Sequence, residues 1–360
     1  MKKLALLSKK GLACCLLDNH QTMKAFFPGW QQKGSVLAFP CGWQRPAKTE
    51  EWAYERCLRD LPENRFAQIV CFPWATLIDL KRKGKLAKAQ CFLEALYWTP
   101  PKTTLIRATV IQHIYAKDVL PFLEQLGITD LFWSHATKSE IRIGNIRIHP
   151  FPLYPVCGED IEFSMENWLI PSEREYLYSF IGFYNPTLYL TESRRGSFEL
   201  ASQDDALIVK RNEWHFEATV YGGQVEGTQL TEKEKSFQNL QEKQYEDVLQ
   251  KSIFSLCPSG SGPNTIRFWE SIGMGALPVL LSENYWMPGE SSEWDGIVFN
   301  VDETREAILS IPTVLRKKTA SMDLLLEKQM KMRKYFDLYG PTGFITDIIK
   351  FFGVGWQATA

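Results

Sequence analysis

The residues of this sequence best suited to chemistry lie between positions 257 and 281, where a loop of small residues meets the start of an expected helix. The loop at 259–262 reads Ser-Gly-Ser-Gly, and Pro263 follows at the expected first helical position, where its missing N–H does no harm. A helix start carries unpaired N–H groups and a partial positive charge, and glycines let an anion approach the main chain. The segment therefore predicts a phosphate site.

Two charged side chains extend this phosphate site. Arg267 and Glu270 are three residues apart in the helix expected at 264–273, so they share one face. A guanidinium forms charge-assisted hydrogen bonds to a diphosphate, and a carboxylate accepts hydrogen bonds from the vicinal hydroxyls of a ribose. The pair suits a nucleotide-sugar donor. The alternative is an internal salt bridge on a surface helix.

A second pair of cations, Arg194 and Arg195, stands near the start of another expected helix. They are the best partners for the far side of a diphosphate, and their alternative is a solvated surface pair. Lys210 and Arg211, at the end of an expected strand, are weaker candidates. The residues expected to line the donor site are Arg194, Arg195, Ser259, Gly260, Ser261, Asn264, Thr265, Arg267 and Glu270.

Metal and cofactor motifs are missing from the sequence. It contains no Asp-x-Asp motif, whereas enzymes that hold a metal on donor phosphates usually need paired carboxylates. Its eight cysteines form no CxxC pair and no Cys/His cluster with zinc spacing, so they indicate small buried side chains in a reducing compartment. We expect no metal and no cofactor, only a nucleotide sugar as substrate, with a UDP-sugar favoured.

A sugar transferred from such a donor to an acceptor hydroxyl needs a general base to take the hydroxyl proton. Two histidines follow expected strands and so stand at carboxyl ends: His113 after 103–111 and His135 after 129–134. Both are candidate bases, and a structural role is the alternative for each. Glu50 and Glu51 open an expected helix, where they favour its dipole.

The elements that must position these residues alternate between strands and helices along both halves. Apolar strands are expected at 35–40, 67–72, 103–111 and 129–134, and again at 176–182, 206–210, 252–257 and 277–281. Helices are expected between them, for example at 76–97 and 231–251. Such alternation predicts βαβ units with parallel sheets, and open α/β sheets bind ligands at the carboxyl ends of their strands.

The domain organisation follows from this alternation and from a proline-rich stretch. Pro150, Pro152 and Pro155 open an extended linker expected at 150–172. We expect an N-terminal, acceptor-side Rossmann-like domain at 1–160, a nucleotide-sugar-binding one at 161–340, and a helix at 341–360 returning to the first domain. A long helix and a shorter one are expected within 311–352.

Composition narrows the class of protein. The 360 residues are 45% hydrophobic with a net charge of -1, and no half is strongly basic, so we expect no nucleic-acid partner. Lys9 and Lys10 interrupt the apolar N-terminus, which argues against a signal peptide, and no apolar run is long enough to span a bilayer. A cytoplasmic protein is expected, with peripheral membrane contact through a basic C-terminal helix as an option.

The strand–loop–helix segment resembles the exostosin-like glycosyltransferases, and the likeness extends over roughly 176–300. The matching residues are Leu256-Cys257-Pro258-Ser259-Gly260, Arg267-Phe-Trp-Glu270 and Gly275-Ala276-Leu277-Pro278-Val279. The resemblance implies a GT-B fold, an α/β architecture of two Rossmann-like domains facing across a cleft. It further implies an inverting transfer from a nucleotide sugar to a glycan or other hydroxyl acceptor, with the donor held by the C-terminal domain.

Three alternatives stay open beside this interpretation. The same scaffold suits GDP-fucose or a CMP-linked sugar as donor. A non-catalytic sugar- or nucleotide-binding module is a second alternative. A nicotinamide dehydrogenase is disfavoured, because the N-terminal half has no GxGxxG run after an early strand.

Overall fold

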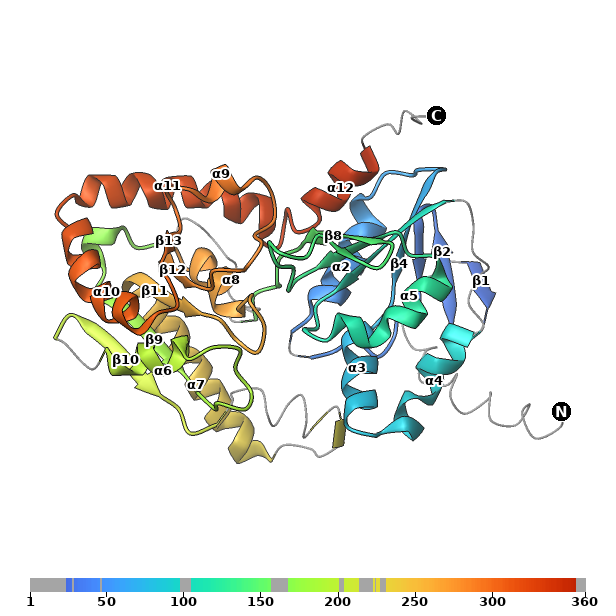
Figure 1. The fold of residues 1–360 in the computed structure, drawn as a ribbon, viewed down its shortest axis with the longest axis horizontal. Coiled ribbons are helices and arrows are strands. Elements are labelled where there is room, and N and C mark those ends of the chain that lie inside the picture. Colours follow the sequence, from blue (N-terminus) through green and yellow to red (C-terminus); the bar gives the residue numbers. More distant parts are fainter. Residues whose placement is uncertain are drawn as a thin grey trace. The chain divides into compact units, whose positions relative to one another are not determined.

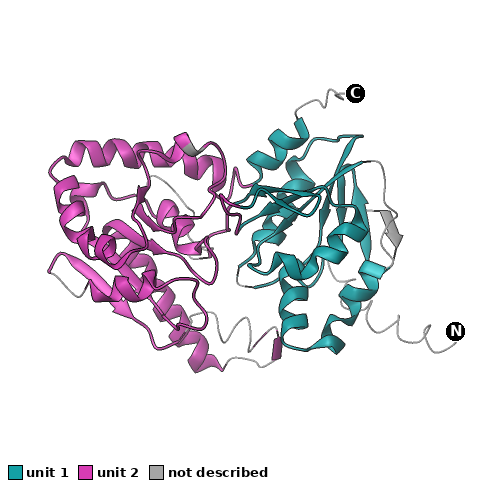
Figure 2. Cartoon of the chain, in the orientation of Figure 1, with its two compact units in different colours: residues 1–134, 140–151, 345–360 teal, residues 135–139, 152–344 magenta. Residues whose placement is uncertain are grey.

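The computed structural model describes residues 24–27, 29–45, 47–97, 105–156, 168–200, 204–213, 223, 225–226 and 231–353. The chain forms two compact units (Figure 2). Unit 1 comprises residues 1–134, 140–151 and 345–360, and unit 2 comprises residues 135–139 and 152–344. After the short excursion at 135–139, the chain passes into the main part of unit 2 at 152, before the boundary expected at 160. The N-terminal segment 1–20 and the middle of the expected linker lie outside the described residues.

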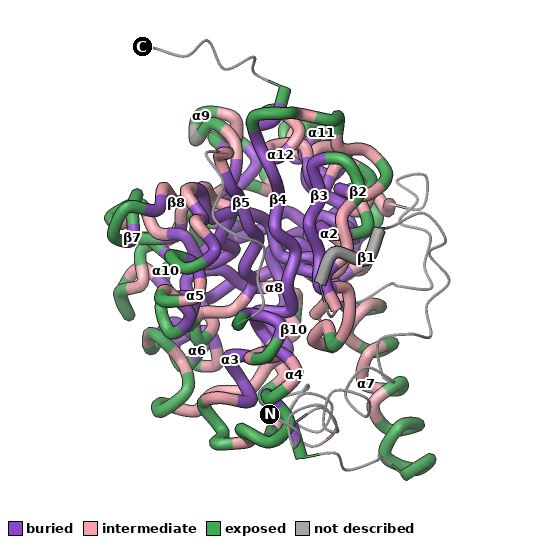
Figure 3. Tube along the Cα trace, turned by 90° about the vertical axis from the view of Figure 1, so that its right-hand side faces the viewer, coloured by how far each residue is buried: buried purple, intermediate pink, exposed green. Residues whose placement is uncertain are grey.

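Unit 1 is built on an eight-stranded sheet in the order β1-β2-β3-β4-β5-β6-β8-β7 (Figure 1). The strands are β1 Lys24–Phe27, β2 Trp30–Lys33, β3 Val36–Ala38, β4 Ala67–Cys71, β5 Ile106–Ile111, β6 Asp130–Trp133, β7 Arg142–Ile143 and β8 Ile146–Pro150. From β3 to β8 the neighbours run parallel. The central strands are apolar because parallel strands are covered on both faces, and Figure 3 shows β4 and β5 as buried.

The helices of unit 1 correct one expectation. They are α2 Thr49–Asp60, α3 Trp74–Arg82, α4 Leu86–Tyr97, α5 Leu120–Leu126 and α12 Thr346–Gly353. The single helix expected at 76–97 is wrong: α3 and α4 are separate, because Gly84 adopts a left-handed φ of 68° that ends the first helix. Strands β7 and β8 form a hairpin, with Gly144 at a φ of 57° in its turn.

The final helix packs on the sheet of unit 1. Phe351 of α12 meets the ring of Phe132 edge-on, with centroids 5.6 Å apart. The Nδ2 group of Asn64 donates to the Phe352 carbonyl over 2.8 Å. Both contacts use the C-terminal turn of the helix, which attaches the end of the described chain to the N-terminal sheet.

Unit 2 contains a five-stranded, fully parallel sheet in the order β10-β9-β11-β12-β13. Its strands are β9 Tyr176–Gly182, β10 Ala206–Lys210, β11 Ser252–Pro258, β12 Leu277–Leu281 and β13 Phe299–Asn300. Strands β11 and β12 are buried along their whole length, as the central strands of a doubly covered sheet must be. The carboxyl ends of all five strands share one edge.

The helices of unit 2 are α6 Ser193–Glu199, α7 Glu232–Gln250, α8 Ile266–Gly273, α9 Ser291–Trp294, α10 Arg305–Lys318 and α11 Met322–Tyr339. The helix expected at 231–251 is confirmed as α7, which begins with a capping box: the Thr231 hydroxyl accepts from the Glu234 N–H, and the Glu234 carboxylate accepts from the Thr231 N–H. One long helix and a short one were expected within 311–352. The structure instead has the end of α10, then α11 and α12, because the chain turns at 319–321.

Two α/β units with parallel central sheets confirm the predicted fold class, a pair of Rossmann-like domains of the kind that make up GT-B enzymes. Among the helices of the described ranges, none combines the length and apolar character needed to cross a bilayer. The edge formed by the carboxyl ends of β9 to β13 is the place to look for a site in unit 2.

Candidate functional site

The loop after β11 leads into a buried helix. Helix α8 begins at Ile266 with Thr265 as its N-cap, so Pro263 precedes the helix rather than occupying its first position as predicted. The Asn264 side chain accepts a hydrogen bond from the Trp269 indole over 3.0 Å, which fastens the loop to the helix. Ser261 is exposed at the loop tip. The loop is therefore fixed at one end and open at the other.

Arg267 lies in the first turn of α8 and is buried. Its guanidinium donates to the Ile181 carbonyl at the end of β9. The guanidinium carbon lies 4.8 Å from the centre of the Phe180 ring and 4.9 Å from that of Tyr245. Its Nε has no hydrogen-bond partner among the residues that the structure describes. A buried cation with an unsatisfied N–H group destabilises the folded protein unless a ligand accepts that hydrogen bond.

Arg194 lies near the same Phe180 ring, 5.8 Å from its centre, and Arg211 interacts electrostatically with Arg267. We call Arg194, Arg211 and Arg267 the arginine cluster. The Arg194 Nε donates to the Ser259 carbonyl over 3.0 Å. Burial lowers the pKa of Arg194 to about 10, and the charge of Arg267 acts in the same direction. Burial and the charge of Arg267 likewise lower the pKa of Arg211. The charge of Arg267 therefore opposes the charges of both Arg194 and Arg211, and an anion would relieve that repulsion.

Arg195 is not part of the arginine cluster. Its side chain is 66% exposed and lies 3.4 Å from the Glu192 carboxylate, which is also exposed. Adjacent residues of a helix point about 100° apart, so only one of Arg194 and Arg195 can face the sheet edge. For Arg195 the alternative of a solvated surface residue agrees with the structure.

Glu270 points to the same region as Arg267, from one turn further along α8. Its Oε2 accepts from the Tyr245 hydroxyl over 2.7 Å, and its Oε1 accepts from the Val156 N–H over 3.3 Å. The side chain is 5% exposed. The alternative of a salt bridge on a surface helix is wrong in its premise, because α8 is a buried helix. A carboxylate oxygen accepts more than one hydrogen bond, so capacity for ribose hydroxyls remains.

His135 stands in a short segment that belongs to unit 2. Residues 135–139 pair with the loop after β12: the Trp286 N–H donates to the Ala136 carbonyl over 3.1 Å, and the Lys138 N–H donates to the Asn284 carbonyl over 3.0 Å. These bonds hold His135, which is 8% exposed, beside the carboxyl end of the sheet that carries the arginine cluster. Tyr285 in the same loop is 1% exposed, so it is a core residue.

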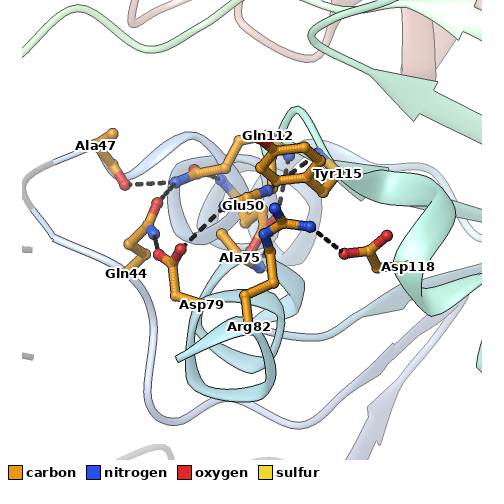
Figure 4. A network of polar contacts seen from close by, with 10 residues as sticks. Gln44, Ala47, Glu50, Ala75, Asp79, Arg82, Gln112, Tyr115 and Asp118 are labelled. Carbon is orange, nitrogen blue, oxygen red and sulfur yellow. Dashed lines mark hydrogen bonds and ion pairs between the residues drawn. The ribbon is translucent and has the colours of Figure 1, made fainter. Parts of the chain in front are cut away.

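His113 contacts Asp79 and Tyr115, two members of the polar network in unit 1 that Figure 4 shows. Its Nε2 lies 3.1 Å from the Asp79 Oδ1, and its Nδ1 accepts from the Tyr115 N–H over 3.1 Å. Asp79 also accepts from the Gln44 amide. Both ring nitrogens of His113 are engaged, which leaves neither free to take a proton from an acceptor hydroxyl.

Glu50 lies at the centre of this network and was underestimated from the sequence. Its carboxyl group accepts from the Ala75 N–H over 3.2 Å and from the Gln112 N–H over 3.1 Å. It therefore serves the start of α3 and the end of β5, not the dipole of its own helix. Burial raises the pKa of the Glu50 carboxyl to about 8, and the nearby Asp79 adds to the rise.

Sequence reasoning missed Tyr245 and ranked Arg211 too low. Both come from segments far from α8 in the chain, and a tyrosine in a long polar helix carries no local signal. Within the described part of the chain, no three His, Cys, Asp or Glu side chains are grouped to hold a metal ion.

Comparisons with known proteins identify the family of the chain. The sequence model of the exostosin GT47 domain matches residues 131–317, which include β6, the arginine cluster and α8. Exostosin-1 of Drosophila melanogaster is 34% identical over 95 residues, 26% of this chain and 12% of that protein. The exostosin-1 homolog of Caenorhabditis elegans is 26% identical over 192 residues, 53% of this chain and 46% of that protein.

Other relatives carry names of related transferases. The probable glucuronosyltransferase GUT1 of Oryza sativa subsp. japonica is 33% identical over 100 residues, 26% of this chain and 23% of that protein. The chain spans less than half the length of these curated relatives. A solved structure of WaaG, a glycosyltransferase involved in lipopolysaccharide biosynthesis, is 12% identical over 75% of this chain and 82% of that chain, with a TM-score of 0.37.

Proposed function

Because the chain belongs to the exostosin family of glycosyltransferases, we propose that it transfers a sugar from a nucleotide-sugar donor, with a UDP-sugar favoured, to a hydroxyl of a glycan or other acceptor. The proposed transfer inverts the anomeric centre and needs no metal. The resemblance seen in the sequence is confirmed by the family match, and the donor, the stereochemistry and the metal requirement are what we propose.

The observation that carries the proposal is the arginine cluster. Arg194 and Arg267 are buried, donate to main-chain carbonyls and lie close enough for their charges to interact. Carbonyl oxygens satisfy N–H groups but leave the positive charges unneutralised. A diphosphate brings the matching negative charge and accepts bidentate hydrogen bonds from guanidinium groups. In low dielectric such pairs stabilise a departing diphosphate as a metal ion would in other enzymes.

The ribose fits beside the diphosphate. Glu270 and Tyr245 stand next to Arg267, and the Glu270 carboxylate retains capacity for the hydroxyls of a ribose. The nucleoside therefore lies toward α7 in this proposal. Ser259, Gly260, Ser261 and Thr265 supply the loop and helix start at the diphosphate, while Asn264 acts through the loop that it fastens.

The reaction has one bond made and one broken at the anomeric carbon. The acceptor hydroxyl oxygen attacks, the bond from that carbon to the diphosphate oxygen breaks, and its electron pair stays with the nucleoside diphosphate. The hydroxyl proton passes to a base. We assign that base to His135, because its segment is fixed to the loop after β12. His113 is the weaker candidate, since protein groups engage both of its ring nitrogens.

A thermal-shift screen tests the donor. UDP, GDP and CMP, each alone and sugar-linked, are added to the purified chain, and a ligand at about 100 times its Kd stabilises the folded state by ~2.7 kcal/mol. We expect UDP to shift Tm most. A shift by GDP or CMP alone would replace the donor, and no shift by any nucleotide would reject the proposal. Binding without sugar transfer to any of a panel of glycan acceptors would favour a binding module.

Two further measurements test the stereochemistry of the transfer and its metal requirement. The anomeric configuration of the product, read by NMR against that of the donor, decides between inversion and retention. Activity in excess EDTA decides the metal requirement. We expect inversion, and we expect full turnover in the presence of EDTA. If EDTA abolishes activity and Mg²⁺ or Mn²⁺ restores it, the transfer needs a metal and that part of the proposal is wrong.

A further inference from the structure

A second polar group, distinct from the arginine cluster, lies at the same sheet edge. Glu303, three residues beyond the end of β13, accepts at its Oε1 from the Thr191 hydroxyl over 2.7 Å and from the Ser259 hydroxyl over 2.9 Å. The Ser193 hydroxyl lies 3.3 Å from that of Ser259. The Glu303 Oε2 is 3.4 Å from the Glu283 N–H. We call Thr191, Ser259 and Glu303 the hydroxyl–carboxylate group.

This group has an unusual balance of charge and exposure. Ser259 is buried, while the Glu303 side chain is partly open to solvent. Within the part of the chain that the structure describes, Glu303 has no ion-pair partner. An accessible, unneutralised carboxylate that holds hydroxyl groups can accept further hydroxyls at little cost, because hydroxyl protons rotate to suit the partners present.

Ser259 joins this group directly to the arginine cluster. Its main-chain carbonyl accepts from Arg194, while its hydroxyl donates to Glu303. The strand order β10-β9-β11-β12-β13 then sets a direction along the edge. Arg211 follows β10 at one side of the sheet, and Glu303 follows β13 at the other. The hydroxyl–carboxylate group therefore adjoins the arginine cluster at Ser259, directly after β11, with the Glu303 carboxylate reaching it from the β13 side and Arg211 lying on the β10 side.

A nucleotide sugar has the same order of chemistry: a nucleoside, a diphosphate and a ring bearing vicinal hydroxyls. We infer that the hydroxyl–carboxylate group is the subsite for the hydroxyls of the transferred sugar, with the Glu303 carboxylate accepting from the ring. This inference rests on the proposed function, because it takes the arginine cluster as the diphosphate site. It orients the donor with its nucleoside toward α7 and its sugar toward β13.

The proposed subsite contacts the sugar and not the nucleotide, so the test compares two dissociation constants: that of a UDP-sugar and that of UDP. Isothermal titration gives Kd for UDP and for UDP-glucose, UDP-galactose, UDP-N-acetylglucosamine and UDP-glucuronate, in the wild-type chain and in Glu303→Gln. Glutamine keeps the shape but removes the charge that strengthens bonds to hydroxyls. We expect Kd for UDP to stay within about twofold and the ratio of the best UDP-sugar Kd to the UDP Kd to rise by about tenfold or more.

Two other variants complete the test. Glu306→Gln changes an exposed carboxylate three residues away on α10 and should leave the ratio at its wild-type value. Thr191→Val removes one hydroxyl of the group without changing its size, and it should raise the ratio several-fold even if Glu303→Gln fails to fold.

An unchanged ratio in Glu303→Gln and Thr191→Val would overturn the inference. So would an equal loss of affinity for UDP and the UDP-sugars, because that result means the group only shapes the loop around Ser259. If wild-type protein binds none of these nucleotides, the proposed function falls and the subsite with it. The two failures are therefore distinguishable: one appears in the wild-type protein, the other only in the variants.

Discussion

Each sheet has a cluster of polar side chains at the carboxyl ends of its parallel strands, yet the two clusters differ in the partners of their charged groups. In unit 1, Asp79 lies between His113 and Gln44, and Glu50 accepts main-chain N–H groups (Figure 4). In unit 2, Arg194 and Arg267 donate to carbonyl oxygens, and the Nε of Arg267 has no partner among the described residues.

The difference separates a structural network from a binding site. A buried network whose donors and acceptors satisfy one another stabilises and fixes its surroundings. A buried group of like charges does the opposite, because each cation lowers the affinity of its neighbours for protons. The sites where proteins keep such unfavourable arrangements are those that a ligand completes. This criterion supports the proposal that unit 2 binds the donor, with His113 in a structural role.

The largest expected effect concerns the two histidines. His135→Ala should lower kcat by about a hundredfold to ten-thousandfold, because a general base contributes that much to proton transfer. His113→Ala should change kcat by less than about threefold, although it loosens Asp79 and lowers Tm. Kd for UDP should stay near its wild-type value in both. The reverse order of the two kcat values would break the comparison, since it would place the reacting proton in unit 1.

The next effect distinguishes arginines inside and outside the cluster. Arg267→Ala should reduce kcat/KM for the donor by about tenfold to a hundredfold, corresponding to ~1.5–3 kcal/mol for charge-assisted bonds. Arg195→Ala, an exposed arginine on α6, is the matched control and should leave kcat/KM within about twofold. Wild-type kinetics in a folded Arg267→Ala protein would remove the arginine cluster from the donor site.

The local pattern of the sequence predicted much of unit 2. The alternation of apolar strands and polar helices gave β9 to β12 nearly to the residue, because parallel strands must be apolar along their length. Arg267 and Glu270 were recognisable because their spacing belongs to one helix. Arg194 was separated from Arg195 only in the structure, since helix phase depends on where α6 begins, and a sequence leaves that uncertain by a residue or two.

Contacts between distant segments were beyond the sequence. Thr191 meets Glu303 across 112 positions, and Tyr245 meets Glu270 across 25. Nothing in the local composition around Glu303 marks it, because an acidic residue before a helix is ordinary. The attachment of residues 135–139 to unit 2 was equally hidden, since it depends on main-chain pairing with the loop after β12. Such partners emerge only when the sheet order is known.

A smaller effect tests whether Tyr245 holds the ribose side of the site. Tyr245→Phe keeps the ring beside Arg267 but removes the hydrogen bond to Glu270. Kd for UDP should rise about threefold to tenfold, because one hydrogen bond contributes ~1 kcal/mol to the free energy of binding. Preference for UDP over 2′-deoxy-UDP should narrow, which a merely structural tyrosine would not cause. Tyr245→Leu loses the ring as well and should bind more weakly still; equal affinities in the two variants would contradict this role of the hydroxyl.

An effect on stability, not on activity or binding, tests the network in unit 1 through pH. Burial raises the pKa of Glu50 to about 8, so between roughly pH 4.5 and 8 the folded protein keeps a proton that the unfolded chain releases. The free energy of unfolding therefore falls as pH rises through this window, by up to ~1.4 kcal/mol per unit, and levels off above it.

Glu50→Gln has no proton to lose, and its carboxamide oxygen can still accept from the Ala75 N–H. We measure Tm by calorimetry from pH 5 to 9. The Tm of the variant minus the Tm of the wild-type protein should increase with pH up to about pH 8. Glu55→Gln, on the exposed side of α2, should follow the wild-type curve. A flat difference for Glu50→Gln would mean that Glu50 is ionised in the folded protein. The network would then hold an unneutralised buried charge, as the arginine cluster does, and would itself become a candidate binding site.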